Sequence, residues 1–426
     1  MSTETDDFIR SVRAFLDANA DPHPRAGELD WGTGSDRIAY FSAEPPDIAA
    51  EKVRAARAWQ RRRYEAGFGW ITGPKEYGGA GLTTVHDLIY QGVEAEYAVP
   101  DTGVISVIGL GMIGPTILTH GRPHVRDRYL PAMYGGDVIA CQLFSEPGAG
   151  SDLAGVETRA VRDGDGWVLT GQKVWTSIAQ HADIGMALCR TDPDKPKHKG
   201  ITAFLVDMKA PGVEVRPLRQ MSGGAEFNEV FLTDVVVPDD HRLGEVDDGW
   251  RVALTTLMNE RATVGGKQTG SVAEALSLAY LVGLLRANGR IHDGAARRDL
   301  ASLYATQAAT EYLNRQAHRR LQAGQNPGPE RSVSKLMYAQ NVIRGAHFAA
   351  DVLGPRLIAD TGAWGTFSWS ELLLSVPALR ILGGTEEIMK NILAERVLGL
   401  PKEPGVDSRT PFRELRRSGG LTGGAA

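Results

Sequence analysis

The most informative segment of this chain is Gln142-Leu-Phe-Ser-Glu-Pro-Gly-Ala-Gly-Ser-Asp-Leu-Ala-Gly155. It contains three glycines, a proline and two serines, so the backbone is expected to bend sharply. Such a bend points several backbone N–H groups at one place, where they can bond the edge of a polar heterocycle or hold phosphate oxygens. An ordinary tight turn explains the same residues equally well when geometry alone is considered.

The segment Lys173-Val-Trp-Thr-Ser177 follows at the end of a predicted strand. An indole and two hydroxyls at the end of a sheet can stack on a flat ring and bond its edge nitrogen. A tryptophan in a strand is also commonly a core residue, so this segment by itself is a weak signal.

Three regions that differ in the spacing and length of their apolar runs predict three domains, and a tail follows them. Residues 1–136 have apolar residues at helical spacing and are expected to form an all-α domain. Residues 137–240 contain short apolar runs without intervening helices, which predicts an antiparallel β-barrel-like domain. Residues 241–404 contain long apolar helices, which predict a four-helix bundle, and residues 405–426 are expected to be a tail. The predicted fold class is therefore α+β multidomain.

The individual elements follow from the same periodicities. Helices are expected at residues 8–20, 47–66, 85–97, 121–134, 250–262, 272–286, 297–323, 331–352 and 385–398. Strands are expected at residues 138–144, 184–189, 202–206, 213–217 and 229–237, and residues 167–175 are expected to form a strand, a turn and a second strand.

Composition excludes several classes of protein. The formal net charge of the 426-residue chain is −5, which gives no overall attraction to nucleic acid or to an anionic membrane. The two cysteines, Cys141 and Cys189, are too few for a disulfide scaffold and argue against a thiolate zinc site, so no metal is expected. The N-terminus lacks a signal-peptide pattern, and no apolar run approaches the about 20 residues that cross a bilayer. The cytoplasm is the expected location.

Taken together, Ser145–Asp152 and Lys173–Ser177 resemble the signature of the acyl-CoA dehydrogenase family. Other stretches resemble the same family in the same order along nearly the whole chain, namely 74–81, 109–115, 221–231 and 383–396. The family's helical domain, β-barrel-like middle domain and C-terminal four-helix bundle agree with the three regions. The resemblance implies an FAD enzyme that dehydrogenates an acyl-CoA thioester, passes electrons to an electron-transfer flavoprotein, and forms a homotetramer or heterotetramer.

The resemblance also implies that the Gly-rich segment lines the flavin. Gln142 and Phe144 would lie along the cofactor, and Ser145 would bond the edge of the isoalloxazine ring. Gly150 and Ser151 would lie near phosphates of FAD or CoA, so Ser151 is expected to contact the substrate as well.

The remaining cofactor contacts implied by the resemblance come from the strand and the last helices. Trp175 would cover the face of the flavin ring, with Thr176 and Ser177 beside its reactive nitrogen. Arg286 would reach the FAD pyrophosphate across a subunit interface. The adenosine diphosphate end of the cofactor would be bound by Thr385, Glu386 and Glu387.

The family's chemistry requires a carboxylate that removes the α-proton while the flavin accepts a hydride from the β-carbon. Burial disfavours the charge of a carboxylate and therefore makes it a stronger base. Many family members place this glutamate immediately before the Gly-Thr of the last motif, where this chain has Gly383. Asn259-Glu260-Arg261 instead resembles the isovaleryl-CoA and long-chain relatives, whose glutamate precedes an arginine on a bundle helix.

Helical periodicity supports this position independently. One apolar stripe is formed by Trp250, Ala253, Leu254 and Leu257. Arg261 falls on that stripe and Glu260 on its border, and a charged pair that faces a core is costly unless it is partnered or functional. An ordinary surface salt bridge is the alternative. With Gly383 at the usual acid position, Glu260 is the predicted base, Arg261 is expected to help hold CoA, and a backbone N–H of Gly383 or Gly384 is expected to polarise the thioester carbonyl.

Two departures from the family pattern leave other functions open. The usual Arg-x-x-Phe-Gly appears only as Arg286-Ala-Asn-Gly289, and the usual Gln-x-x-Gly-Gly is Asp351-Val-Leu-Gly-Pro355. A non-catalytic or partner subunit of a heteromeric dehydrogenase is therefore one alternative, and a flavin oxidase or monooxygenase of the same fold is another. Glycine at 383 suggests a wide acyl pocket, so a branched acyl or sterol side-chain thioester is a possible substrate.

Overall fold

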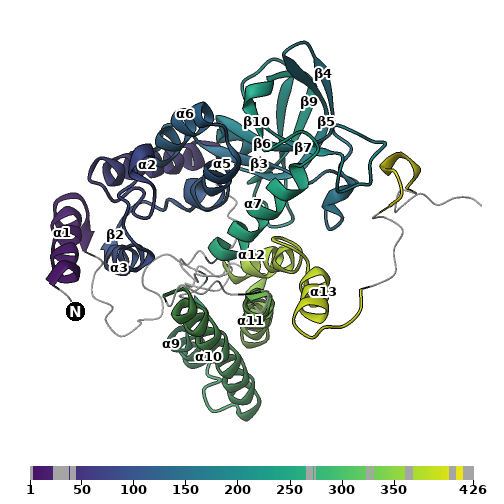
Figure 1. Cartoon of the computed structure of the whole chain (residues 1–426). Coiled ribbons are helices and arrows are strands. Elements are labelled where there is room, and N and C mark those ends of the chain that lie inside the picture. The colour runs from purple at the N-terminus through teal and green to yellow at the C-terminus, as the bar shows by residue number, and fades with distance from the viewer. Residues whose placement is uncertain are drawn as a thin grey trace, which may run out of the picture.

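The computed structural model describes residues 3–22, 38, 45–264, 272, 275–322, 328, 331–359, 368–402 and 409–415. Within these ranges the chain forms a helical N-terminal domain, a middle β-sheet domain and a helical C-terminal domain (Figure 1). The predicted fold class is confirmed.

The N-terminal domain surrounds a cluster rich in aromatic side chains. Val12 and Leu16, about one helical turn apart on the first helix, are fully buried and pack in one cluster with Trp59 and Tyr90. The helices are α1 (Thr3–Asn19), α2 (Pro46–Glu65), η1 (Lys75–Tyr77), α3 (Thr84–Glu94), α4 (Gly103–Ile105), the π-helix η2 (Ser106–Ile113), α5 (Gly114–His120) and α6 (Pro123–Tyr134). Two short strands, β1 (Asp21–Pro22) and β2 (Tyr97–Ala98), pair with each other. A π-helix is rare and often lies at a functional site.

The middle domain is a twisted sheet of eight strands in the described part of the chain. The strands are β3 (Ala140–Leu143), β4 (Arg159–Asp163), β5 (Gly166–Ser177), β6 (Ile184–Arg190), β7 (Ile201–Asp207), β8 (Val213–Leu218), β9 (Phe227–Pro238) and β10 (Arg242–Leu243). Their order is β10-β7-β6-β4-β5-β9-β8, with β3 beside β6. Most pairs are antiparallel as predicted, but β3 and a single bridge of β4 pair with β6 in parallel.

The predicted turn inside residues 167–175 is wrong, because β5 is one continuous strand. Gly171 bends the ladder without reversing it, and the register with β9 shifts between Leu169 and Gly171. A side-chain carbon at Gly171 would lie only 2.7 Å from Cα of Thr158. The glycine therefore allows a close approach of two backbones rather than a turn.

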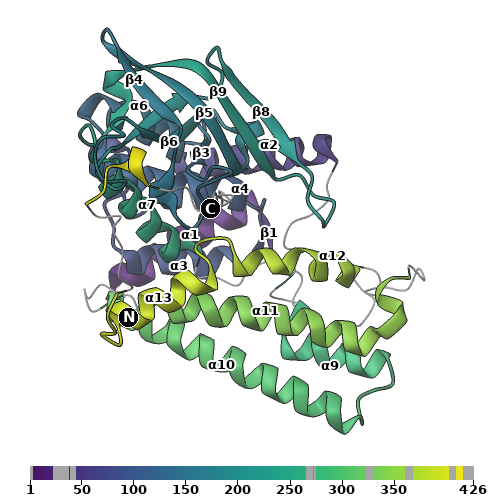
Figure 2. The same cartoon turned by 90° about the vertical axis from the view of Figure 1, so that its right-hand side faces the viewer.

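The C-terminal domain contains helices that lie side by side beneath the sheet (Figure 2). They are α7 (Gly249–Val264), α9 (Leu278–Ala287), α10 (Gly294–Gln322), α11 (Arg331–Leu353), η6 (Gly354–Leu357), α12 (Ser368–Ser375), η7 (Val376–Arg380) and α13 (Glu386–Arg396). Their shared core includes Leu281, Leu284, Ala349, Trp369 and Leu372, each at most 1% exposed. Helix α12 is not predicted from the sequence. Parts of the helices predicted over 272–286 and 297–323 lie outside the described residues.

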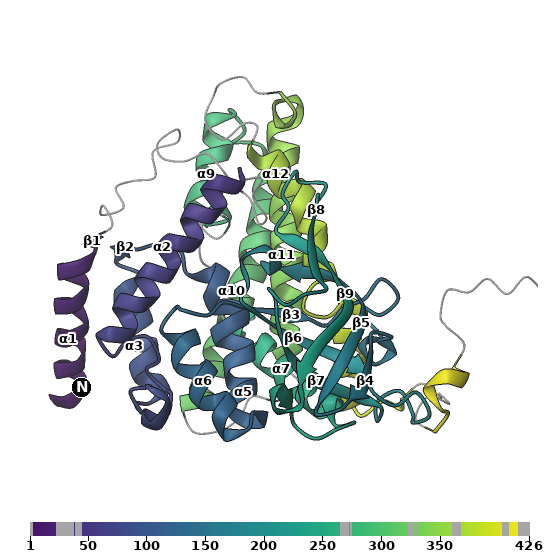
Figure 3. The same cartoon turned by 90° about the horizontal axis from the view of Figure 1, so that it is seen from above.

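Helix α7 lies where the three domains meet. It packs against η2 and α5 of the N-terminal domain, β7 of the sheet, and α11 of the C-terminal domain. Seen from above, it lies between the N-terminal helices and the sheet (Figure 3). A side chain near the end of α7 is therefore within reach of groups from all three domains.

Candidate active site

The two signature segments are joined directly in the folded chain. The Gly-rich segment leaves β3 at Leu143, and the backbone carbonyl of Ser145 accepts a hydrogen bond of 2.9 Å from the N–H of Val174 on β5. Gln142 is half-buried on β3, and Phe144 is buried beside it. The structure thus brings together the predicted flavin-edge segment and the predicted ring-covering strand.

A buried ion pair holds these two segments at a fixed distance. Nζ of Lys173, which is fully buried, lies 2.7 Å from Oε1 of Glu146 and also donates to the carbonyl oxygens of Phe144 and Leu188. Burial alone would raise the pKa of the Glu146 carboxyl, but Lys173 and two backbone N–H donors more than offset this and lower the pKa. This pair is not predicted from the sequence, because a Lys and a Glu that lie 27 positions apart carry no local signal.

Trp175 stands out of the sheet at a strained position. Its φ angle is +60°, in the left-handed region that non-glycine residues rarely adopt, and its side chain is 60% exposed. The strain occurs where the register between β5 and β9 shifts, between Lys173 and Thr176. The edge of the Phe227 ring supports the indole at a centroid distance of 5.9 Å. The backbone therefore presents a large aromatic face to open space.

Thr176 and the glycines complete a surface that suits a flat, polar-edged cofactor. Oγ1 of Thr176 is buried, yet no group in the described part of the chain bonds it. Ser177 is half-buried beside it, and Gly150 and Ser151 are exposed. A side-chain carbon built on Gly148 or Gly150 meets no atom within 4 Å, so these backbones face open space. An aromatic face, an unsatisfied hydroxyl and an open glycine bend fit a flavin nucleotide.

The buried face of α7 differs from the stripe expected from the sequence. Leu254 is 40% exposed, whereas Ala253 and Thr256 are fully buried. Oγ1 of Thr256 bonds Oγ1 of Thr116 on α5 at 3.0 Å, which fixes this face against the N-terminal domain. Glu260, four residues after Thr256 and seven after Ala253, belongs to the same face and is half-buried. The predicted position of Glu260, on the border of the apolar stripe, is therefore wrong, because the residue lies on the buried face itself. The side chain of Arg261 lies outside the described residues.

Glu260 faces the loop that precedes α13. Gly383 and Gly384 have φ angles of +63° and +92°, which favour glycine. A side-chain carbon built on Gly383 would lie 3.2 Å from Oε1 of Glu260. The carboxylate of Glu260 on α7 therefore lies next to residue 383, where many family members carry their catalytic acid.

Lys335 of α11 anchors the same loop and was missed by the sequence analysis. Its Nζ donates to the carbonyl oxygens of Gly384 at 2.6 Å and Leu379 at 3.1 Å. Burial lowers the pKa of Lys335, while the charges of Glu386, Glu260 and Glu387 act in the opposite direction. Its spacing with the buried residues of α11 was the available signal, since it falls on the apolar stripe of Ala339, Val342 and Ala346.

The remaining predicted contacts lie at the start of α13 and on α9. Thr385 caps α13 by accepting from the N–H of Ile388, Glu386 is buried and paired with Arg380 at 3.1 Å, and Glu387 is exposed. Arg286 is exposed in the last turn of α9. Thr385, Glu386 and Glu387 directly follow Gly383 and Gly384 in the sequence and lie at the start of α13. Arg286 lies on a different helix, α9.

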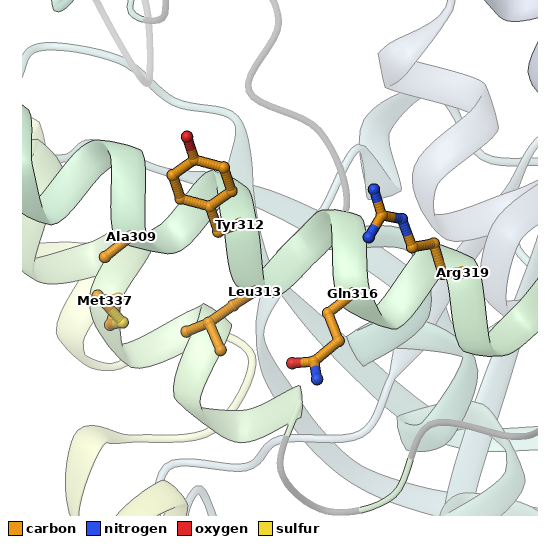
Figure 4. Close-up of a pocket in the computed structure, with 6 residues that line it drawn as sticks. All are labelled: Ala309, Tyr312, Leu313, Gln316, Arg319 and Met337. Carbon is orange, nitrogen blue, oxygen red and sulfur yellow. The ribbon is translucent and has the colours of Figure 1, made fainter.

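A separate groove of about 670 Å³ lies between α10 and α11 (Figure 4). It is lined by Ala309, Tyr312, Leu313, Gln316, Arg319 and Met337. None of these residues was predicted for the site, and none is a carboxylate that could act as the base. Among the described residues there is no cluster of His, Cys, Asp or Glu that could hold a metal, and none of their helices is long and apolar enough to span a membrane.

Comparisons with known proteins point to one family along most of the chain. Three family models match: acyl-CoA dehydrogenase, N-terminal domain, at residues 2–137, its middle domain at 141–235, and its C-terminal domain at 247–398. The acyl-CoA dehydrogenase IpdE1 of Mycobacterium tuberculosis is 38% identical over 94% of this chain and 99% of its own length. The acyl-CoA dehydrogenase FadE34 of the same organism is 46% identical over 68% of this chain, but the match spans only 39% of FadE34.

Solved structures show the same fold. The Tcur3481-Tcur3483 steroid ACAD has a TM-score of 0.72 and 26% identity, covering 95% of this chain and 99% of that one. The ChsE4-ChsE5 complex of Mycobacterium tuberculosis has a TM-score of 0.68 and 25% identity, covering 95% and 99%. Because three family models match most of its length and a relative is 38% identical over 94% of it, the chain belongs to the acyl-CoA dehydrogenase family.

Proposed function

We propose that this chain is an FAD-dependent acyl-CoA dehydrogenase in which Glu260 removes the α-proton of the thioester. The observation that supports this assignment is the 3.2 Å between Oε1 of Glu260 and the place where a side chain at Gly383 would begin. A glutamate at either position would deliver its carboxylate to the same region. Glycine at 383 leaves that region to Glu260.

The residues around Glu260 suit a proton transfer. The carboxylate is half-buried at the end of the face that carries Ala253 and Thr256, beside the loop that contains Gly383. A backbone N–H of Gly383 or Gly384 is proposed to donate to the thioester carbonyl and stabilise the developing enolate. When bound, FAD supplies the hydride acceptor for the β-carbon.

The cofactor would be held by the two joined signature segments. Ser145 and Gly150 would offer polar groups along the bend, Trp175 an aromatic face, and Thr176 its unsatisfied hydroxyl. Further contacts are proposed for Gln142, Phe144, Ser151, Ser177, Thr385, Glu386 and Glu387, and Arg261 is proposed to hold the CoA side.

Replacement of Glu260 by Gln tests the base. Glu260→Gln keeps the size of the side chain but cannot accept the proton, so flavin bleaching by acyl-CoA in stopped flow is expected to slow by about 10²–10⁴-fold. Glu395→Gln, which changes another half-buried helical glutamate, is the matched control and should reduce at the normal rate. A normal flavin spectrum in both proteins shows intact folding. Undiminished bleaching in Glu260→Gln would rule out the assignment.

An electron-transfer flavoprotein is the proposed acceptor, and a homotetramer or heterotetramer is the proposed assembly. Arg286 is exposed on α9, and Tyr312 is 68% exposed beside the α10–α11 groove, so both can contact another subunit. Light scattering of the purified chain, alone and with a co-expressed homologue, tests the assembly. Slow reoxidation of the reduced protein by air, with rapid reoxidation by an electron-transfer flavoprotein, would separate a dehydrogenase from an oxidase.

A further inference from the structure

A segment near the C-terminus docks on the middle domain, far from α13 in the fold. Residues 409–415 contain a short helical turn, η8 (Phe412–Glu414), that lies against the loop between β6 and β7 (Figure 1). The N–H of Phe412 donates to the carbonyl of Lys195 at 2.9 Å, and the N–H of Arg413 donates to that of Pro193 at 3.1 Å. Arg413 also pairs with Asp194. We call residues 409–415 the C-terminal clamp.

The clamp covers a buried arginine. The guanidinium of Arg190, at the end of β6, lies 3.8 Å from the centre of the Phe412 ring. Arg190 is 5% exposed and donates to the carbonyl oxygens of Ala154 at 2.6 Å and Lys197 at 2.7 Å. A cation held against an aromatic face and shielded from water is stabilised more than one at the surface. Phe412 therefore covers the Arg190 guanidinium, which bonds the end of the Gly-rich segment at Ala154.

A second connection leads to the same segment. Nζ of Lys197 lies 2.9 Å from both carboxylate oxygens of Asp152, the last residue of the Ser145–Asp152 motif. Two side chains next to the clamp therefore contact the Gly-rich segment. Lys197, in the loop between β6 and β7, pairs with Asp152, and Arg190, at the end of β6, donates to the carbonyl of Ala154. Glycine bends of this kind present backbone N–H groups to phosphates only while their conformation is held.

The loop is also tied to the start of α7. Nζ of Lys195 lies 2.5 Å from Asp247, and the hydroxyl of Thr191 donates to the same carboxylate at 2.5 Å. Asp247 has a φ of +66° and lies two residues before α7 begins. The clamp, the Gly-rich segment and the entry to α7 therefore share one loop.

We propose that the C-terminal clamp is a positioning element for the phosphate-binding end of residues 148–155, and that it sets the affinity for a pyrophosphate-bearing nucleotide. Phe412 acts through Arg190, and Arg413 acts through the loop. The ligand is either FAD or the CoA end of the substrate. The identity of these two ligands rests on the proposed function, whereas the contacts of the clamp do not.

The experiment uses the full-length protein with Phe412→Ala, the conservative Phe412→Tyr, and a chain that ends at residue 415 as the matched control. Titration of the apoprotein with FAD gives one affinity, and calorimetry with free CoA gives the other. With Phe412→Ala, one of these dissociation constants is expected to rise about 5- to 20-fold, while Phe412→Tyr and the shortened chain stay near the starting value.

Steady-state kinetics then separates the two ligand sources. If CoA is the ligand, Phe412→Ala raises KM for an acyl-CoA but not for the matching acyl-pantetheine, and kcat is unchanged. If FAD is the ligand, flavin occupancy falls and KM stays the same. The proposal is overturned if neither dissociation constant changes by more than twofold, or if Phe412→Ala lowers kcat per bound flavin for both thioesters alike. Both binding measurements remain valid if Glu260 proves not to be the base.

Discussion

Oε1 of Glu260 lies 3.2 Å from the point where a side-chain carbon on Gly383 would sit. The two residues are 123 positions apart in the sequence, on α7 and in the loop before α13. A carboxylate on α7 and a carboxylate at 383 would therefore compete for one space.

Gly383→Ala is expected to impair catalysis more than folding. The new methyl group would press on the Glu260 carboxylate at 3.2 Å, a spacing that forces the neighbour to move. Rates of flavin reduction are expected to fall at least tenfold. Gly164→Ala is the matched control, because Gly164 also has a positive φ, +54°, but no atom within 4 Å. Backbone strain alone costs about 1 kcal/mol or somewhat more in both variants. Equal reduction rates in the two variants would contradict the crowding.

Lys335→Met is expected to loosen the Gly383–Gly384 loop. The variant keeps an unbranched apolar stem but loses the bonds to the carbonyls of Gly384 and Leu379, which should cost about 2–3 kcal/mol in the free energy of unfolding. The loss of a cation near Glu260 should also move the acidic limb of the pH–rate profile to higher pH, because the ionised carboxylate loses a favourable charge.

Lys390→Met provides the comparison for Lys335. Lys390 is 60% exposed on α13 and lies 3.9 Å from Glu386. It is a cation close to the same loop but on the protein surface, whereas Lys335 is buried and bonds the loop carbonyls. Urea unfolding and the pH dependence of flavin reduction should both remain near those of the unmodified protein. Similar shifts in the two variants would mean that net charge, rather than the position of Lys335, is responsible.

Lys173→Met is expected to destabilise the protein strongly. It leaves the Glu146 carboxylate buried without its cation, and breaking a buried pair in this way costs about 3–5 kcal/mol. The double variant Lys173→Met/Glu146→Gln should recover part of that loss, since no buried charge remains. Lys209→Met, which breaks a pair with Asp183 from a 75% exposed lysine, should cost about 1 kcal/mol or less. Chemical denaturation measures all three, and a double variant no more stable than Lys173→Met would argue against the buried charge as the cause.

Asp239→Asn tests a pH-dependent contribution to stability. Burial opposes ionisation of Asp239, but hydrogen bonds from Trp167, Arg242 and Arg122 prevail and lower its pKa from 3.8 to about 2. Because the folded-state pKa lies below the unfolded value, the stabilisation is fully present above about pH 4 and is lost as the pH falls toward 2. Urea unfolding should show a constant deficit for the variant from pH 7 to 5 that shrinks below pH 4. A deficit that stays constant down to pH 3 would contradict this origin.

Much of the architecture followed from local patterns. Helical spacing predicted α2, α6 and α11 closely, and short apolar runs predicted β6 to β9, because burial of one stripe or one strand is encoded by neighbouring residues. Two errors share one cause. A turn is predicted within residues 167–175, but Gly171 there allows a close approach to Thr158, and Leu254 is predicted on the buried stripe but is exposed. In both cases a partner distant in the sequence decided the outcome.

The order of the motifs, the family that they resemble and the replacement of the usual acid by Gly383 can all be read from the amino-acid sequence. Packing of distant elements is needed to bring Glu260 to Gly383, to let Lys335 donate to the loop beside them, and to place Phe412 against Arg190. The physical reason is one of range. Propensity, periodicity and turn chemistry act over a few residues, whereas contacts among α7, α11 and the C-terminal clamp depend on how complete elements pack.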